Sequence, residues 1–353
     1  MIRSRSYIAT PPGATIKEQL EDRGMSQKEF ALRMEMSEKH ISNLINGAVQ
    51  LTPSMAYRLE MVLGLPASFW SSLESRYREK LERVQEENAL DDDLEIAKHF
   101  PVKKMVQLGW IPDADNKTDR VIALRKFFEV VHLASLLDPS LVPHIACRRQ
   151  AVTEKADYSL IAWVQEAKIE ARQIPTASIN LKELNDQLPA IRAMTTQDPS
   201  IFSSALADLL SDCGIALVYL PHIAGSFLHG ATFCDGNKIV IGLTLRGKDA
   251  DKFWFSLFHE IGHVLLGHLN KKDGTDAEDE DNADRFARDT LIPKEEFDAF
   301  VDSRDFSRES IIDFAQKIGI DPGIVVGRLQ KESYIEFSWY HDLKKQYELI
   351  PED

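Results

Sequence analysis

Apolar residues recur every three to four positions along most of the chain, which is the spacing of amphipathic helices. In the first fifty residues this pattern predicts three short helices. The first ends at Gly24, the second runs through Arg33, and the third ends at Asn46-Gly47. Ser26 and Ser37 precede the second and the third of them, as N-cap residues do. Two short capped helices joined by a tight turn are typical of a helix-turn-helix, with residues 37–45 as the recognition helix.

The helical spacing continues beyond this first unit. A helix is predicted to run on from Tyr77 into a connector, residues 81–99, which holds seven acidic and two basic side chains. Four further helices are expected before the chain reaches residue 212, at Val121–Leu133, Leu160–Ile174, Leu181–Met194 and Phe202–Leu210.

The pattern changes after Cys213-Gly214, where short apolar runs separated by turn residues predict strands. Asp235-Gly-Asn237 has the composition of a hairpin turn, so we expect a small antiparallel sheet. The predicted strands are Ile215–Leu220, Gly230–Cys234 and Lys238–Leu243. Helical spacing returns after them, and the predicted helices are 253–268, 278–293, 307–318, 322–332 and a last one in 333–353 with a frayed end.

These elements predict a mainly α fold with a small antiparallel β-sheet, of the α+β class. We divide the chain into a helix-turn-helix unit, an acidic linker with a helical scaffold, a core that carries the sheet, and a C-terminal helical region. The corresponding residues are 1–80, 81–212, 213–300 and 301–353.

The composition is ordinary for a globular protein, with 44% hydrophobic and 28% charged residues in 353. The net charge of −14 argues against a surface that coats nucleic acid, yet residues 1–80 hold 11 Lys and Arg against 9 Asp and Glu. A DNA-binding face is therefore expected only there. We find no long apolar run and no signal peptide, so we expect a cytoplasmic protein without membrane contact. Cys147, Cys213 and Cys234 lack pair spacing and are predicted to be buried thiols.

The apolar segment 253–268 contains His259-Glu260-x-x-His263. Four residues make about one helical turn, so both imidazoles project from one face and can bind a single Zn²⁺, with Glu260 beside them. Zinc lowers the pKa of a bound water from 15.7 to about 7, and a carboxylate can accept the proton of that water. The spacing therefore predicts metal-assisted hydrolysis with Glu260 as the catalytic base.

A catalytic zinc needs a third protein ligand, and the later acidic helix offers one. Glu280 shares the helical stripe of Ala283 and Ala287, two small residues that would let this helix approach the first one closely. Glu280 is therefore the predicted third ligand. Glu278 and Asp281 remain as alternatives, because neighbouring carboxylates are chemically equivalent ligands.

Two more polar residues follow from the same helices. Asp284 lies one turn beyond Glu280 and is expected to accept a hydrogen bond from the free ring nitrogen of a ligating histidine. His268 comes nine residues after His259, which turns it to the opposite helix face, so we expect it at the surface or at the helix end.

Seven polar residues of the helix-turn-helix are predicted to contact operator DNA. The apolar residues of this unit would form its core, which leaves the polar set free to meet base edges and phosphates. The set is Gln27, Ser37, Glu38, Lys39, His40, Ser42 and Asn43, and the core is Phe30, Ala31, Ile41, Leu44 and Ile45. We expect binding as a homodimer. The weak positive charge keeps open the alternative of a helical bundle that binds a protein.

A sheet followed directly by this histidine-bearing helix is the zincin arrangement, in which an edge strand receives an extended substrate backbone. Lys238, Val240 and Gly242 belong to the strand that we predict to be this edge. The alternative is that the strand only packs against the helix.

Two parts of the chain resemble known families. Ser26-Gln-x-x-Phe-Ala31 with Ser37-x-x-x-Ile-Ser-x-Leu-Ile-Asn-Gly47 resembles the Xre-type repressor domain, and its continuation through Phe69-Trp-Ser-Ser-Leu73 is similar to HigA-type antitoxins of that class. Ser256-Leu-Phe-His-Glu-Ile-Gly-His-Val-Leu-Leu-Gly-His268, followed by Glu280-x-x-Ala-Asp-Arg-Phe-Ala-x-x-x-Leu-Ile-Pro293, resembles the ImmA/IrrE family of bacterial metallopeptidases.

In the ImmA/IrrE family two histidines and a later glutamate bind zinc, and the motif glutamate is the general base. The resemblance implies these roles for His259, His263, Glu280 and Glu260. Members of the family cleave repressors or regulate transcription, so the resemblance also implies a protein substrate, either a repressor or a toxin partner.

The sequence thus predicts a transcriptional regulator that binds operator DNA and carries a zinc endopeptidase, which cleaves a partner or the chain itself. One rival is a DNA-binding antitoxin or repressor whose peptidase-like domain senses or binds a partner with little or no proteolysis. The other is a protease whose helix-turn-helix recruits a repressor through protein contacts.

Overall fold

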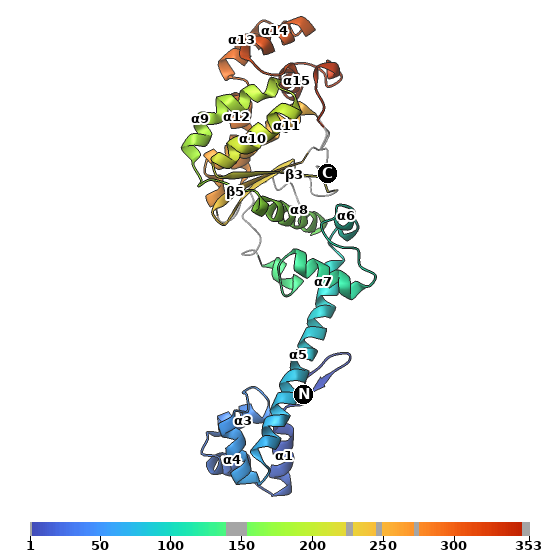
Figure 1. Ribbon diagram of the computed structural model, residues 1–353, viewed down its shortest axis with the longest axis vertical. Coiled ribbons are helices and arrows are strands. Elements are labelled where there is room, and N and C mark those ends of the chain that lie inside the picture. The colour runs from blue at the N-terminus through green and yellow to red at the C-terminus, as the bar shows by residue number, and fades with distance from the viewer. Residues whose placement is uncertain (1, 139–153, 224–228, 245–248, 272–274, 348–353) are drawn as a thin grey trace. The chain divides into compact units, whose positions relative to one another are not determined.

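The computed structural model describes residues 2–138, 154–223, 229–244, 249–271 and 275–347 (Figure 1). The chain forms two compact units, Met1–Ile96 and Ala97–Asp353. None of the helices among the described residues is long and apolar enough to cross a membrane. The finer division into four segments stays a prediction.

The first unit is a bundle of helices that confirms the predicted helix-turn-helix. Ser26 Oγ accepts a hydrogen bond from Glu29 N, and Ser37 Oγ accepts one from His40 N, so both serines cap helices as expected. The predicted core residues Phe30, Ala31, Ile41 and Leu44 are buried, and Ile45 packs against them half-buried. The helices are α1 (Gly13–Asp22), α2 (Gln27–Arg33), α3 (Glu38–Ile45), α4 (Pro53–Leu63) and α5 (Ala67–Ala97).

Helix α5 takes in most of the acidic connector, as the helix predicted to continue from Tyr77 does. Near its middle it holds a short hairpin of β1 (Ile2–Arg3) and β2 (Ile8–Ala9). The carboxylate of Glu87 accepts hydrogen bonds from the hydroxyls of Ser4 and Ser6 and from Ser6 N. These bonds lower the pKa of Glu87 to about 2.

The second unit is built around a three-stranded sheet. Its helices before the sheet are α6 (Val102–Gln107), α7 (Lys117–Phe127), α8 (Glu154–Gln173), α9 (Leu181–Ala193) and α10 (Pro199–Asp212), with short 3₁₀ helices η1 (Leu133–Leu137) and η2 (Met194–Thr196). The strands are β3 (Ile215–Leu220), β4 (Gly230–Asp235) and β5 (Lys238–Thr244). After them come α11 (Ala250–Leu265), η3 (His268–Asn270), α12 (Ala277–Leu291), α13 (Lys294–Asp302), α14 (Arg308–Ile318), α15 (Pro322–Lys331) and η4 (His341–Leu343).

The sheet is mixed, so the expectation of an antiparallel sheet was wrong in this respect, although the α+β class is confirmed. Its strand order is β3-β5-β4, with β4 antiparallel and β3 parallel to β5. The hairpin turn fixes β4 against β5 locally, whereas the pairing of Ile215 with Ile239 joins distant parts of the chain. The sequence pattern therefore predicts the pairing of β4 with β5 and contains no signal for the pairing of β3 with β5.

The two faces of the sheet are covered by different helices, with α8 on one side and α11 on the other (Figure 1). Successive strand residues point to opposite faces, so Ala216 and Val240 pack with Trp163 of α8 while their neighbours join the α11 core. Trp163 is fully buried. A Cβ at Gly242 would lie 2.5 Å from the Trp163 ring, so glycine there allows α8 to approach.

The C-terminal region differs from its prediction in two respects. Helix α13 was not predicted, because its short apolar pattern follows directly on the helix that ends before Pro293. A helix over 333–353 was predicted, yet the described part, up to Tyr347, holds only η4 and a bridge between Gln346 and Asp249. Trp254 Nε1 donates a hydrogen bond to the Tyr347 hydroxyl at 3.0 Å, so this segment packs on the beginning of α11.

The cysteines follow their prediction only in part. Cys213 is buried, as expected, whereas Cys234 is exposed, because it lies near the end of the outer strand β4. Cys147 lies outside the described residues.

Candidate metal centre

Helix α11 carries three polar side chains of the predicted centre on an otherwise apolar element. Its neighbouring residues Phe258 and Ile261 are fully buried in the main core, which fixes the rotation of the helix. His263 is 0% exposed and Glu260 3% exposed, and the His259 side chain is mostly buried as well. Burial of three polar groups on one helix is costly unless they have partners.

Helix α12 brings the fourth side chain. His259 Nε2 lies 3.0 Å from His263 Nε2, and Glu280 Oε2 and Oε1 lie 3.4 and 3.5 Å from these two nitrogens. One ligand atom from each of the three residues lies within 4.8 Å of the ligand atoms of the other two, so the three side chains could hold a metal ion together. The alternatives Glu278 and Asp281 are both exposed.

Close packing of the two helices makes this arrangement possible. Ala283 and Ala287 of α12 are fully buried, in agreement with the small-residue stripe read from the sequence. On α11, a Cβ at Gly262 would lie only 3.4 Å from the Ala283 Cα and 3.0 Å from the Phe286 ring. Gly262 was not singled out from the sequence, although its place between the two motif histidines was visible.

The donor set itself fits a divalent cation. Two imidazole nitrogens 3.0 Å apart either share one proton or direct two lone pairs at each other, and a cation removes that conflict. Glu280 Oε2 is buried, and no hydrogen bond among the described residues reaches it. Two imidazoles and a carboxylate form the ligand type that zinc uses in catalytic sites with an open fourth position.

Asp284 lies where the sequence predicted an acceptor. Its Oδ1 is 2.8 Å from His259 Nδ1, the ring nitrogen that faces away from Glu280. Burial opposes a charge on His259, but Asp284 and Glu280 outweigh it and raise the pKa of this imidazole to about 10. Burial, followed by the neighbouring His259, lowers the pKa of His263 to about 4, so the two imidazoles differ in protonation.

Strand β4 holds the side chain of Glu260. Thr232 Oγ1 donates a hydrogen bond to Glu260 Oε2 at 2.5 Å, and a Cβ at Gly230 would lie 2.6 Å from Oε1. Complete burial is the main reason that the pKa of Glu260 rises to about 7, with His259 and Thr232 acting in the opposite direction. Such a pKa suits a group that accepts and returns a proton near neutral pH.

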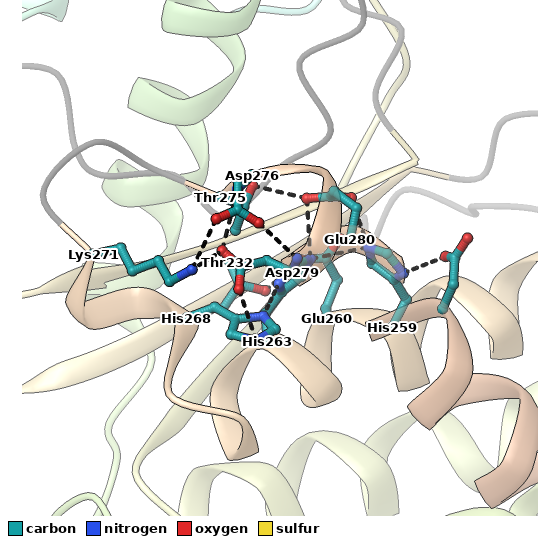
Figure 2. A network of polar contacts seen from close by, with 11 residues as sticks. Thr232, His259, Glu260, His263, His268, Lys271, Thr275, Asp276, Asp279 and Glu280 are labelled. Atoms are coloured by element: carbon teal, nitrogen blue, oxygen red, sulfur yellow. Dashed lines mark hydrogen bonds and ion pairs between the residues drawn. The ribbon is translucent and has the colours of Figure 1, made fainter. Parts of the chain in front are cut away.

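His268 lies just beyond the end of α11, as one of the two expectations for it had it, but it is buried, so the expectation of a surface position was wrong. Helix α11 ends at Leu265 and Gly267 adopts a left-handed φ of +76°, which turns the chain back so that His268 faces His263. The two Nδ1 atoms are 2.9 Å apart, and His268 Nε2 lies 3.3 Å from Asp279 Oδ1 (Figure 2). Burial lowers the pKa of His268. Sequence reasoning assumed a continuous helix and therefore missed His268 and Asp279.

The strand predicted to receive substrate is not an edge. Strand β5 lies between β3 and β4, so both of its backbone edges are already paired. Lys238 Nζ donates to the carbonyl oxygens of Ala171 and Ile174, while Val240 and Gly242 lie against α8. The prediction for Lys238, Val240 and Gly242 was wrong, because a hairpin signal does not show which of its strands gains a second partner.

The first unit places the predicted DNA-contacting residues at the start of α2 and along α3. Four of them are exposed and three are half-buried. The exposed ones are Gln27, Ser37, Glu38 and Lys39, and the half-buried ones are His40, Ser42 and Asn43. The Nε2 atom of His40 is buried and has no hydrogen-bond partner among the described residues, so it is not presented to solvent.

Comparisons with known proteins agree with both units. Residues 16–70 match the family model described as "Helix-turn-helix", and residues 230–330 match a peptidase-family model described as "IrrE N-terminal-like domain". An uncharacterized HTH-type transcriptional regulator of Escherichia coli, YddM, is 36% identical over 66 residues, which are 19% of this chain and 70% of that protein. The chain therefore belongs to the Xre-type helix-turn-helix regulators and carries an ImmA/IrrE-like peptidase-family domain in its second unit.

Proposed function

We propose that the second unit is a zinc-dependent endopeptidase that cleaves a repressor or another partner protein, or the chain itself. The observation that carries this proposal is the buried group of His259, His263 and Glu280 with the carboxyl of Glu260 on the same helix. A bound zinc ion would supply polarisation of a peptide carbonyl and acidification of water.

Residues of the chain would bind the metal, orient one of its ligands and transfer protons. His259, His263 and Glu280 would hold the metal, and Asp284 orients His259. Glu260 is the proposed general base: it would take a proton from water and pass it to the leaving amine. Thr232 occupies Glu260 Oε2, which leaves Oε1 as the oxygen that exchanges protons.

The substrate would add to β4 rather than to β5. Strand β4 is an outer strand, and its second edge pairs with no strand among the described residues. Its inward residues Gly230 and Thr232 touch Glu260, so a peptide extended along β4 would run past the base. Backbone hydrogen bonds would then position the scissile bond, and the amino-acid sequence of the substrate would matter little for this positioning.

The first unit would direct the protein to a specific site on DNA. A helix-turn-helix domain supports DNA binding. We propose that α3 contacts an operator as part of a homodimer in the cytoplasm, with Lys39 and Asn43 among the contacts. Cleavage by the second unit would then change transcription at that operator.

Intact-protein mass spectrometry tests the proposed activity. The chain would be co-expressed with the proteins of neighbouring genes as wild type, as Glu260→Gln and as Glu295→Gln, a matched change at an exposed carboxylate. Fragments in the wild type and in the Glu295 variant, and none in the Glu260 variant, are the expected result and locate the cleaved bond.

Full-length species alone in all three samples, with zinc bound, would refute proteolysis. That result would favour a repressor or antitoxin whose peptidase-family domain senses or binds a partner. DNA binding by residues 1–80 that weakens as salt rises would exclude the model in which the helix-turn-helix only recruits a protein.

A further inference from the structure

His263 has a buried polar partner that the proposed chemistry does not use. Figure 2 shows a row of side chains that leads from His263 through His268 to Asp279 and Lys271. The separations are 2.9 Å between the two Nδ1 atoms, 3.3 Å from His268 Nε2 to Asp279 Oδ1, and 2.5 Å from Lys271 Nζ to Asp279 Oδ2. His263, His268 and Asp279 are all buried.

The proton positions in this row follow from the carboxylate at its end. Asp279 Oδ1 lies 3.3 Å from His268 Nε2 as an ion-pair contact, and because a carboxylate only accepts, its negative charge favours a proton on His268 Nε2. A neutral His268 then has a lone pair on Nδ1, and only an N–H on His263 Nδ1 can fill the 2.9 Å contact. His263 is thereby left with its lone pair on Nε2, the nitrogen that faces His259 and Glu280.

The opposite direction would remove a ligand. If His268 Nδ1 donated to His263 Nδ1, the proton of a neutral His263 would lie on Nε2 and point into the candidate metal position. The carboxylate of Asp279 therefore selects, through two rings, the tautomer that a metal requires.

Asp279 is itself held firmly. Its Oδ2 accepts from Lys271 Nζ and from Asp276 N, and its backbone N donates to Asp276 Oδ1, which completes a capping box at the start of α12. The adjacent residue is Glu280, so one helical turn fixes the end of the row and the third ligand together.

We propose that His268 and Asp279 are positioning residues for His263, which hold its ring in the Nδ1–H tautomer and direct the Nε2 lone pair at the metal. This inference rests on the proposed metal site. In this arrangement each of the two histidine ligands is oriented by a different partner. Asp284 orients His259, and the pair of His268 and Asp279 orients His263.

Zinc affinity of the full chain tests the inference without any substrate. Competition with a chromophoric chelator would be measured for the wild type, His268→Leu, His268→Asn, and His341→Leu as a control at an exposed histidine. Loss of an outer-shell partner weakens metal binding about 10- to 100-fold, so we expect a loss of this size in the Leu variant. The Asn variant keeps an acceptor near the Nδ1 position and should recover most of the affinity, and the control should bind as the wild type does.

A second measurement reads the tautomers directly. Long-range ¹H–¹⁵N correlation spectra of metal-free protein with labelled histidine should show His263 with its proton on Nδ1 and His268 with its proton on Nε2. In the His268→Leu variant, the Nδ1–H of His263 should lose its hydrogen-bond acceptor, which moves the resonance of this proton upfield, while circular dichroism shows an unchanged fold.

The outcomes separate this inference from the proposed function. Wild-type zinc binding that is lost in Glu280→Gln but unchanged in folded His268→Leu would overturn the positioning role and leave the metal site standing. A proton on His263 Nε2 in the wild type would overturn it as well. Absence of any zinc binding in the wild type would overturn both, since His263 would then have no metal to be positioned for.

Discussion

Replacing Glu260 by glutamine should stabilise the metal-free protein while it abolishes the proposed cleavage. Complete burial raises the pKa of this carboxyl from 4.5 to about 7, so the folded state holds its proton more tightly than the unfolded chain does. The stability that this proton contributes is fully present below pH 4.5 and is lost as the pH rises through 7.

The size of the effect follows from the shift. At about 1.4 kcal/mol per pKa unit, the rise from 4.5 to about 7 corresponds to roughly 3 kcal/mol of folding free energy between pH 4.5 and 8. The glutamine side chain of the variant has no proton to lose and can still pair with the Thr232 hydroxyl. The variant and the wild type should therefore have similar stability near pH 5, and the variant should be more stable by up to about 3 kcal/mol at pH 8.

Urea unfolding in the presence of a chelator, followed by circular dichroism at pH 5, 6, 7 and 8, measures this difference. Glu295→Gln changes an exposed carboxyl and should follow the wild-type curve at every pH. Parallel curves for the wild type and Glu260→Gln across this range would refute the reasoning, because they would mean that Glu260 ionises in the folded protein as freely as in the unfolded chain.

Three further outcomes are expected. Gly230→Ala should reduce cleavage about 100-fold in the mass-spectrometric assay, because its Cβ would lie 2.6 Å from Glu260 Oε1 and displace the base; unchanged turnover would show that the carboxylate moves freely. Zinc binding near pH 8 should release about one proton, since His259 holds one there with a pKa of about 10, and calorimetry in two buffers of different ionisation enthalpy measures it. Lys39→Ala should weaken binding to duplex DNA and reduce the salt slope by about one in fluorescence anisotropy, whereas an unchanged slope would place Lys39 away from the phosphates.

The sequence by itself determined the local elements and the candidate ligands that lie on them. Ser26 and Ser37 cap α2 and α3 because a cap needs only residues a few positions away. The two motif histidines lie on one face of α11 because a helical turn fixes their spacing. Glu280 was separated from its exposed neighbours by the alanine stripe of the same helix, which is again a local pattern.

Only the tertiary structure decided how distant segments meet. The parallel pairing of β3 made β5 the central strand and left β3 and β4 as the two outer ones, so the strand predicted to be the substrate edge is not an edge. The backbone turn at Gly267 carried His268 back to His263, and the fold brought Thr232 of β4 to Glu260. Such contacts depend on packing between segments, and hydrophobic periodicity encodes the face that an element buries but not the partner that it meets.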